Sequence, residues 1–167
     1  WALFGLRREP QPLLLAARGT ATVGDTELPL PAPFIGLPLE SLRALRTGAR
    51  YLLSIENLAS FHDAARAPGA ERALLVYTGG MPSPAWRAAY VRILADLPAQ
   101  APVFHWGDID EGGFRIAAKL AETAAAAGRS LRPWRMSPDG LPDELRARAA
   151  RPDAARLERM RGWAIRA

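Results

Sequence analysis

The sequence FHWGDIDEGGFRIAAKL, residues 104–120, contains the main signals for the fold of this chain. It joins a short apolar run over residues 101–106 to a helical pattern over residues 111–127, in which apolar side chains recur every three or four positions. An acidic turn that contains Asp108 and Asp110 separates the two. The stretch therefore predicts a strand, a polar turn and a helix in immediate succession.

The same alternation of strand and helix extends to both sides of this stretch. Apolar runs predict further strands over residues 51–55, 73–77 and 131–136. Periodic segments predict further helices over residues 57–65 and 84–97. Alternating strands and helices favour parallel pairing with right-handed crossovers. We therefore expect an α/β fold, a doubly wound sheet of about four parallel strands. Pro133 cannot donate to a ladder, so its strand is expected at an edge.

The first 48 residues have a different pattern. Short apolar or alternating runs over residues 2–6, 12–17 and 20–30 predict a small β-rich element, with a hairpin turn at Gly24 and Asp25. A short helix is expected over residues 39–45. We predict three parts: the β-rich lead-in at 1–48, a catalytic domain at 49–140, and a basic helical tail at 141–167 that is broken near Pro152.

Composition excludes several classes of protein. The 167 residues include 22 Lys and Arg, 17 Asp and Glu, two His and no Cys, so disulfides, thiol nucleophiles and Cys-based zinc sites are excluded. No apolar stretch is long enough to span a membrane, and no signal peptide is recognisable. All Lys and Arg residues except Lys119 are arginines. Either a GC-rich genome or a phosphate-binding surface would explain this excess of arginine. The start at Trp1 predicts a piece of a longer protein.

Three carboxylates are expected at the ends of strands. Glu56 follows the strand at 51–55, and Asp108 and Asp110 follow the strand at 101–106. If these strands are neighbours, the three acids converge at the carboxyl edge of the sheet, where ligands bind in such folds. Oxygen ligands of this kind suit Mg²⁺. The alternative is structural: Asp110 caps the following helix and Asp108 is a turn residue.

The combination resembles the Toprim fold of topoisomerases, bacterial primases and several nucleases, over roughly residues 50–136. The match is closer to one branch. The stretches YLLSIENLASF (51–61), VYTGGMPSPAW (76–86) and FHWGDIDEGGFRIAAKL look like the C-terminal Toprim domain of JetD-type subunits of Wadjet plasmid-defence systems. PFIGLPLESLRAL (33–45) resembles the lead-in to that domain.

This resemblance implies a function and a set of residues. It implies a bacterial, cytoplasmic endonuclease domain, related to the A subunit of topoisomerase VI, that uses Mg²⁺ or Mn²⁺ to cleave invading circular DNA. The family's glutamate falls on Glu56 and its aspartate pair on Asp108 and Asp110, as catalytic residues and metal ligands. Expected partners are double-stranded DNA, other subunits of an SMC-like defence complex, and a second copy in a homodimer, with no membrane.

Further residues have accessory roles in this interpretation. Glu111 is a loose candidate for a third acid, while Asn57 and His105 are accessory candidates. For His105 a core or supporting role is favoured over a role as a ligand. Tyr51, Tyr77 and Tyr90 are expected to pack in the core, so that an activated water is favoured over a tyrosyl–DNA intermediate.

Arginines and Lys119 suggest a path for DNA beside the acids. Arg115 and Lys119, and after them Arg129 and Arg132, are candidates for phosphate contacts, although such charges are often simply solvated.

Two alternative functions remain at this point. One is a non-catalytic Toprim module that positions DNA or docks a partner. The other, which is weaker, is a phosphatase of the haloacid-dehalogenase type.

Overall fold

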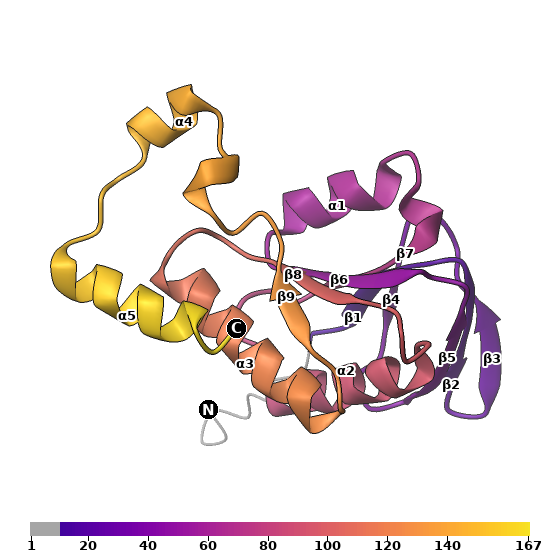
Figure 1. Cartoon of the computed structure of the whole chain (residues 1–167). Coiled ribbons are helices and arrows are strands. Elements are labelled where there is room, and N and C mark those ends of the chain that lie inside the picture. Colours follow the sequence, from indigo (N-terminus) through magenta and orange to yellow (C-terminus); the bar gives the residue numbers. More distant parts are fainter. Residues whose placement is uncertain (1–10) are drawn as a thin grey trace, which may run out of the picture.

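The computed structural model describes residues 11–167, so the apolar run expected over residues 2–6 lies outside it. Two sheets form the framework (Figure 1). The larger sheet has six strands, in the order β4 (Ile35–Leu37), β1 (Leu13–Ala16), β7 (Ala73–Tyr77), β6 (Tyr51–Ile55), β8 (Val103–Trp106) and β9 (Leu131–Pro133). The smaller sheet has the order β3 (Thr26–Pro29), β2 (Gly19–Val23) and β5 (Leu42–Thr47).

The parallel strands confirm the expected α/β architecture. β6 pairs in parallel with β7 on one side and with β8 on the other, and β8 pairs in parallel with β9. Helix α1 (Leu58–Arg66) covers one face of this sheet, while α2 (Pro84–Asp96) and α3 (Glu111–Ala126) cover the other (Figure 1). β9, which contains Pro133, lies at the edge of the sheet, as its missing donor predicts.

The strand order reverses between β6 and β8. From β6 the chain moves through α1 to β7 on one side, and it then returns through α2 to β8 on the other. Because crossovers are right-handed, this reversal puts α1 and α2 on opposite faces. The carboxyl ends of β6 and β8 thus lie at the point of reversal, which is the usual ligand position in such sheets.

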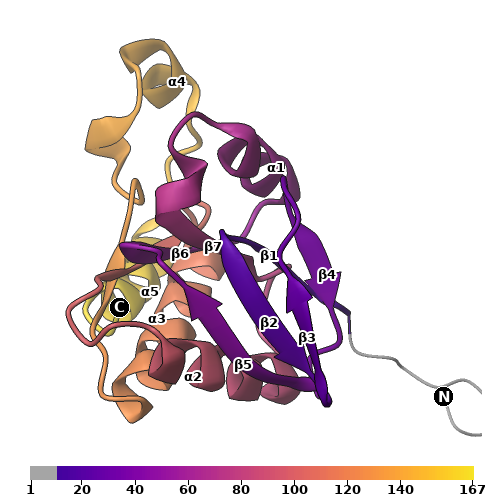
Figure 2. The same cartoon turned by 90° about the vertical axis from the view of Figure 1, so that its right-hand side faces the viewer.

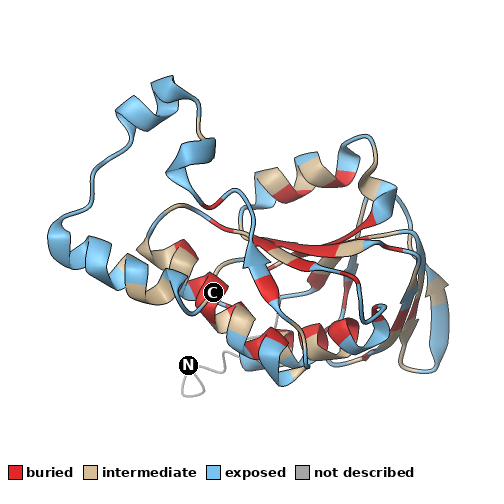
Figure 3. Ribbon diagram, in the orientation of Figure 1, coloured by how far each residue is buried: buried red, intermediate tan, exposed pale blue. Residues whose placement is uncertain are grey.

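Each face of the large sheet has its own apolar core. The smaller core lies under α1, where Phe61 is fully buried against Ile55 and Leu75. The larger core lies under α2, α3 and the small sheet, and it includes Tyr90 and Leu120. Figure 3 shows this burial as a red central sheet with red inner faces on the helices. Apolar packing therefore covers both faces of the large sheet.

The N-terminal strands are divided between the two sheets. β1 pairs antiparallel with both β4 and β7, and so extends the sheet of parallel strands. β2 and β3 form the expected hairpin, with Gly24 in a left-handed turn conformation at φ 58°. Figure 2 shows this small sheet standing beside α2.

The prediction of a short helix over residues 39–45 is wrong, because this segment leads into strand β5. β5 pairs antiparallel with β2, and the register skips Arg43 at a bulge. An extra residue in one strand shifts the alternation of its side chains. Leu42 and Leu45 are therefore both buried, although they are three positions apart, and their spacing imitates a helix.

The C-terminal residues form two further helices, α4 (Asp143–Arg148) and α5 (Ala154–Ala164), separated around Pro152 as expected. α5 lies along α3, whereas α4 projects away (Figure 1), and neither of these two helices has a buried residue (Figure 3). Within residues 11–167, no helix has the length and apolar character that crossing a membrane requires.

Candidate metal centre

Glu56 and the acidic loop meet because β6 and β8 end in register. Ile55 pairs with Trp106, and the Glu56 amide continues the ladder by donating to the Trp106 carbonyl at 2.9 Å. The chain then turns at Gly107, and the Asp108 amide donates to Glu56 Oε2 at 3.2 Å. The structure therefore places the Glu56 carboxylate directly against the backbone of Asp108, at the point where the strand order reverses.

Two glycines allow this close approach. A Cβ on Gly107 would stand 2.9 Å from Glu56 Oε2, and a Cβ on Gly113 would overlap the Asp108 carbonyl oxygen. Contacts this short are not tolerated between a Cβ and backbone, so the acidic loop packs onto α3 only because residue 113 has no side chain. Both glycines lie in the stretch FHWGDIDEGGFRIAAKL, whose glycines suggest a close backbone approach, although these particular contacts are not visible in the sequence.

Asp110 has a structural function at the start of α3. Its Oδ1 accepts a hydrogen bond from the Gly113 amide at 2.8 Å, which makes Asp110 the N-cap of α3. Within the part of the chain that the structure describes, no three His, Asp or Glu side chains gather closely enough to form a complete ligand set. The structure thus brings Glu56 to the loop of Asp108, while Asp110 is oriented by the helix that it caps.

The pKa of Glu56 is raised above its ordinary value. Burial is the largest cause, and the negative charges of Asp108 and Asp110 add to it. The hydrogen bond from the Asp108 amide acts in the opposite direction. A carboxylate with a raised pKa is a better proton acceptor than an ordinary one, which suits a general base.

His105 lies directly behind this site in the core. It is fully buried on β8, and its Nδ1 is 3.0 Å from the hydroxyl oxygen of Ser54 on β6. Ser54 also donates to the Phe104 carbonyl at 3.1 Å. Burial lowers the pKa of His105 to about 4, so the imidazole is neutral near pH 7. A serine within an otherwise apolar strand is the signal in the sequence for this pair.

The buried imidazole predicts a loss of stability in acid. The unfolded chain takes up a proton near pH 6.5, whereas folded His105 takes one up only near pH 4. The free energy of unfolding should therefore fall as the pH drops from about 6.5 to 4, by about 3 kcal/mol for a difference of about 2.5 pH units. Urea unfolding at several pH values measures this fall. His105→Gln should flatten the profile in this range, and an equally steep profile in that variant would contradict the assignment.

The other accessory candidates have structural partners. Glu111 forms a bidentate ion pair with Arg159 of α5, with hydrogen bonds of 2.8 and 3.1 Å. This hydrogen bonding lowers the pKa of Glu111. Asn57 caps α1 by accepting from the Ser60 amide at 3.1 Å. Glu111 thus helps to hold α5 against α3, and Asn57 stabilises the start of α1.

The basic candidates for a DNA path divide into two groups. Arg115 is exposed on α3, and Lys119 of the same helix pairs with Glu122 at 2.8 Å. Arg129 is different, because its guanidinium donates to the carbonyls of Leu97 and Ala101. Arg129 therefore has a structural function, because it fastens the segment after α3 to the end of α2.

The three tyrosines lie in or against the core, as expected. Tyr90 is fully buried and stacks on Trp86, with the ring centroids 4.9 Å apart. Tyr51 and Tyr77 are strand residues that pack against the core under α1.

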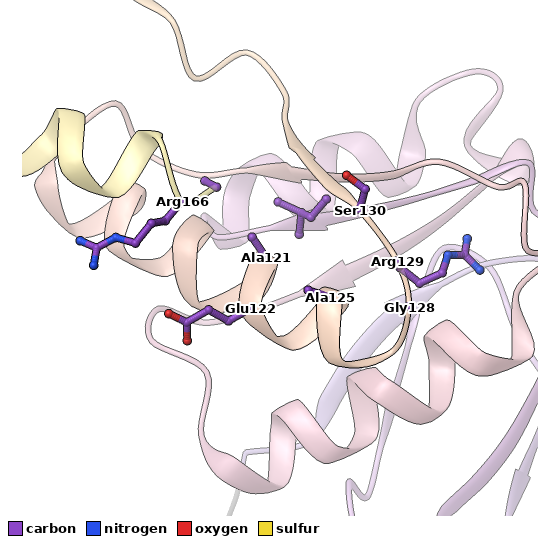
Figure 4. Close-up of a pocket in the computed structure, with 9 residues that line it drawn as sticks. Ala121, Glu122, Ala125, Gly128, Arg129, Ser130 and Arg166 are labelled. Carbon is purple, nitrogen blue, oxygen red and sulfur yellow. The ribbon is translucent and has the colours of Figure 1, made fainter.

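An open hollow of about 640 Å³ lies on another part of the surface (Figure 4). It is lined by Ala121, Glu122 and Ala125 from the second half of α3, by residues 128–131, and by Arg166 and Ala167 at the end of the chain. The 16-residue helix α3 is about 24 Å long, and the acidic loop lies at its opposite end. The hollow is therefore separate from the candidate metal centre.

The family model described as "Wadjet protein JetD, C-terminal" matches residues 5–159. Among curated proteins, none matches the chain.

Proposed function

The chain belongs to the JetD C-terminal family of the Wadjet defence system, and from this premise we propose that it is a metal-dependent DNA endonuclease domain. Its substrate would be invading circular DNA, in which it would cleave phosphodiester bonds. The observation that carries the proposal is the contact between Glu56 and the Asp108 loop where the strand order reverses. A Glu after one strand and an Asp-x-Asp after its neighbour is also the arrangement that the resemblance to Toprim enzymes implies.

The residues at this edge fit a hard divalent cation. Mg²⁺ prefers oxygen ligands, and it usually binds through one or two carboxylates together with waters and substrate phosphates. Glu56 and Asp108 supply two carboxylates, so a complete set of three is not required before DNA binds. Asp110 caps α3 through Oδ1, which leaves Oδ2 as an additional oxygen donor. We therefore assign Glu56, Asp108 and Asp110 to Mg²⁺ or Mn²⁺, which would supply charge stabilisation at the phosphate and the leaving oxygen.

In this proposal the chain's own residues activate a water. Glu56, with its raised pKa, is the candidate base that removes a proton from the attacking water, or else it holds a second cation. The positions of the three tyrosines in or against the core favour this hydrolytic route over a covalent tyrosyl–DNA intermediate.

The charge of the C-terminal part supports DNA as the substrate. Residues 131–167 contain nine arginines and five acidic residues, and most of these residues are exposed. Arginine makes paired hydrogen bonds to phosphate. Arg115, which follows the acidic loop on α3, is exposed as well. We propose that these cations hold double-stranded DNA across the acidic edge, and that the other Wadjet subunits deliver it.

Removal of metal tests this proposal. EDTA should stop the cutting of plasmid DNA by the protein together with its Wadjet partners, because two neighbouring carboxylates cannot stabilise a dianionic transition state without a cation. Addition of Mn²⁺ or Mg²⁺ in excess of EDTA should restore it. Agarose-gel conversion of supercoiled plasmid to linear or nicked forms measures the rate. Cutting that continues undiminished in EDTA would contradict a metal-dependent mechanism.

A non-catalytic module is the second candidate. It is favoured by the engagement of Asp110 as a helix cap and by the pairing of Glu111 with Arg159, which give two of the acids structural functions. In that case the domain would position DNA or dock a partner. Mutation of Asp108, whose carboxylate has no such assigned function, separates the two candidates.

A further inference from the structure

A groove lies on the face of the large sheet that α1 covers. α1 packs on β6 and β7 (Figure 1), and a hollow of about 390 Å³ separates it from the tryptophans that follow β9 and end β8. Ser60 and Ala64 line this groove from α1, Leu53 lines it from β6, and Trp106 and Trp134 line its other side. Trp134 is 37% exposed and Trp106 is half-buried. The groove has the size and the apolar lining of a binding site.

Strand alternation gathers aromatic and basic side chains beside this groove. Phe104 of β8 and Arg132 of β9 are register partners, and the residue before each of them belongs to the core under α2 and α3. Because side chains alternate between the two faces of a strand, Phe104 and Arg132 point to the opposite face. Trp106 and Trp134 follow two positions later, and the exposed Arg135 lies over the Trp134 ring, with its guanidinium carbon 4.9 Å from the ring centroid. We call these five residues the aromatic–basic face.

The two tryptophans of this face are held in place by their neighbours. The Trp134 amide donates to the His105 carbonyl at 2.7 Å, and its ring meets that of Trp106 nearly at a right angle, with the centroids 5.1 Å apart. Arg135 has a φ of 57°, in the left-handed region that costs free energy for a residue with a side chain. A ligand that packs on the two rings therefore does not have to order them first, which favours its binding.

The charge and the position of the face indicate the chemistry of its ligand. Among the described residues, Arg132 and Arg135 are exposed and form no ion pair with a carboxylate, so both are free to bind phosphate. The acid that lines the groove, Asp63, lies on the opposite wall, on α1. Trp106 is two residues before Asp108, so the face leads directly to the acidic loop. Aromatic rings that stack on bases, combined with cations that hold the backbone, are typical of sites for single-stranded nucleic acid.

We propose that the aromatic–basic face binds a single-stranded segment of DNA beside the phosphodiester bond that is cut. A base of this segment packs in the groove against Trp106 and Trp134, while Arg132 and Arg135 hold its phosphates on the side of β9. The inference rests on the proposed function and deepens it, because it states the form of DNA that the site takes. That form is circular DNA whose strands are locally unpaired next to the acidic loop.

The test measures binding of a fluorescein-labelled oligothymidylate to the chain by fluorescence anisotropy, in EDTA so that no metal contributes. Trp134→Ala should weaken binding by about five- to a hundredfold, the range that alanine substitution gives at aromatic residues that stack on bases. Trp134→Phe retains an aromatic ring and should recover most of the affinity. A duplex of the same length should bind with little dependence on Trp134, because its bases are already stacked on one another.

A matched control and a second variant keep the test decisive. Trp163 also has an arginine over its ring, Arg166 at 4.1 Å, but it lies on α5, away from this face. Trp163→Ala should therefore leave the affinity unchanged. Arg132→Ala should weaken binding and reduce the slope of log affinity against log salt concentration by about 0.7, as loss of one phosphate contact to a single strand does. Circular dichroism checks that each variant has the native fold.

Two results would overturn the inference. One is a chain that does not bind oligothymidylate, or that binds it equally well in folded Trp134→Ala and folded Arg132→Ala. The other is a Trp134→Ala variant that binds the oligonucleotide normally but loses binding to another Wadjet subunit, because the face would then dock a protein.

Plasmid cutting in Mn²⁺ by the protein with its Wadjet partners distinguishes this inference from the proposed function. If the plasmid is cut but binding of the oligonucleotide does not depend on Trp134, only the inference is overturned. If binding depends on Trp134 but no cutting occurs, the proposed nuclease activity fails, whereas the assignment of the face to single-stranded DNA is supported.

Discussion

Asp108→Ala is expected to abolish the cutting of circular DNA while the domain stays folded. The side chain of Asp108 is exposed, and only its backbone amide bonds to Glu56, so alanine retains that bond. Loss of a carboxylate that holds the cation removes several kcal/mol of transition-state stabilisation, which corresponds to about a 10³-fold lower rate. Plasmid cleavage by the protein with its Wadjet partners measures the rate, and thermal unfolding measures the stability.

The control for this experiment is Asp63→Ala. Asp63 is also an exposed aspartate, but it lies on α1, outside the acidic loop. It should cut at the normal rate. Normal cutting by Asp108→Ala would instead favour the non-catalytic candidate, in which the domain positions DNA for another active site.

Gly113→Ala is expected to have the second large effect. The new Cβ would overlap the carbonyl oxygen of Asp108 and stand 2.9 Å from its amide nitrogen, so the acidic loop has to move away from α3. Overpacking of this kind costs about 1–3 kcal/mol. We expect the free energy of unfolding in urea to fall by about this amount. Cutting should fall with it even where the domain is folded, because Asp108 leaves Glu56.

The neighbouring Gly112 provides a matched control for this variant. A Cβ on Gly112 would meet only Asp110 Oδ1, at 3.2 Å, and alanine within a helix is favoured over glycine by about 0.5–1 kcal/mol. Gly112→Ala should therefore be close to neutral or slightly stabilising. Equal effects of the two substitutions would show that the packing of the loop on α3 does not depend on the missing side chain at position 113.

The parallel strands and their helices were predictable because local patterns of apolar residues in the sequence indicate them. Residues 51–55 and 73–77 became β6 and β7 with the expected bounds, and the helix expected at 84–97 became α2. The strands of the lead-in segment were harder to predict, because they form by pairing with strands that are distant in the sequence. β5 needs β2 and a bulge at Arg43 to bury Leu42 and Leu45, and no local pattern contains that bulge.

The candidate site was predictable in part for the same reason. Acids that follow two neighbouring parallel strands have to meet at one edge, which brought Glu56 to Asp108. The functions of Glu111 and Arg129 depend on segments far away in the chain, namely α5 and the end of α2. The Ser54–His105 pair links residues 51 positions apart, so only the unusual serine in an apolar strand pointed to it.

The short outer strands of the large sheet limit how this chain can assemble with other chains. β4 and β9 have three residues each, and Pro133 removes a donor from β9. A free edge must be longer and better supplied with donors to template the strand of another molecule. Continuation of this sheet from one molecule into the next is thus disfavoured, which protects the chain against edge-to-edge aggregation. Contacts with a second copy, or with other subunits, are accordingly not expected to extend the large sheet.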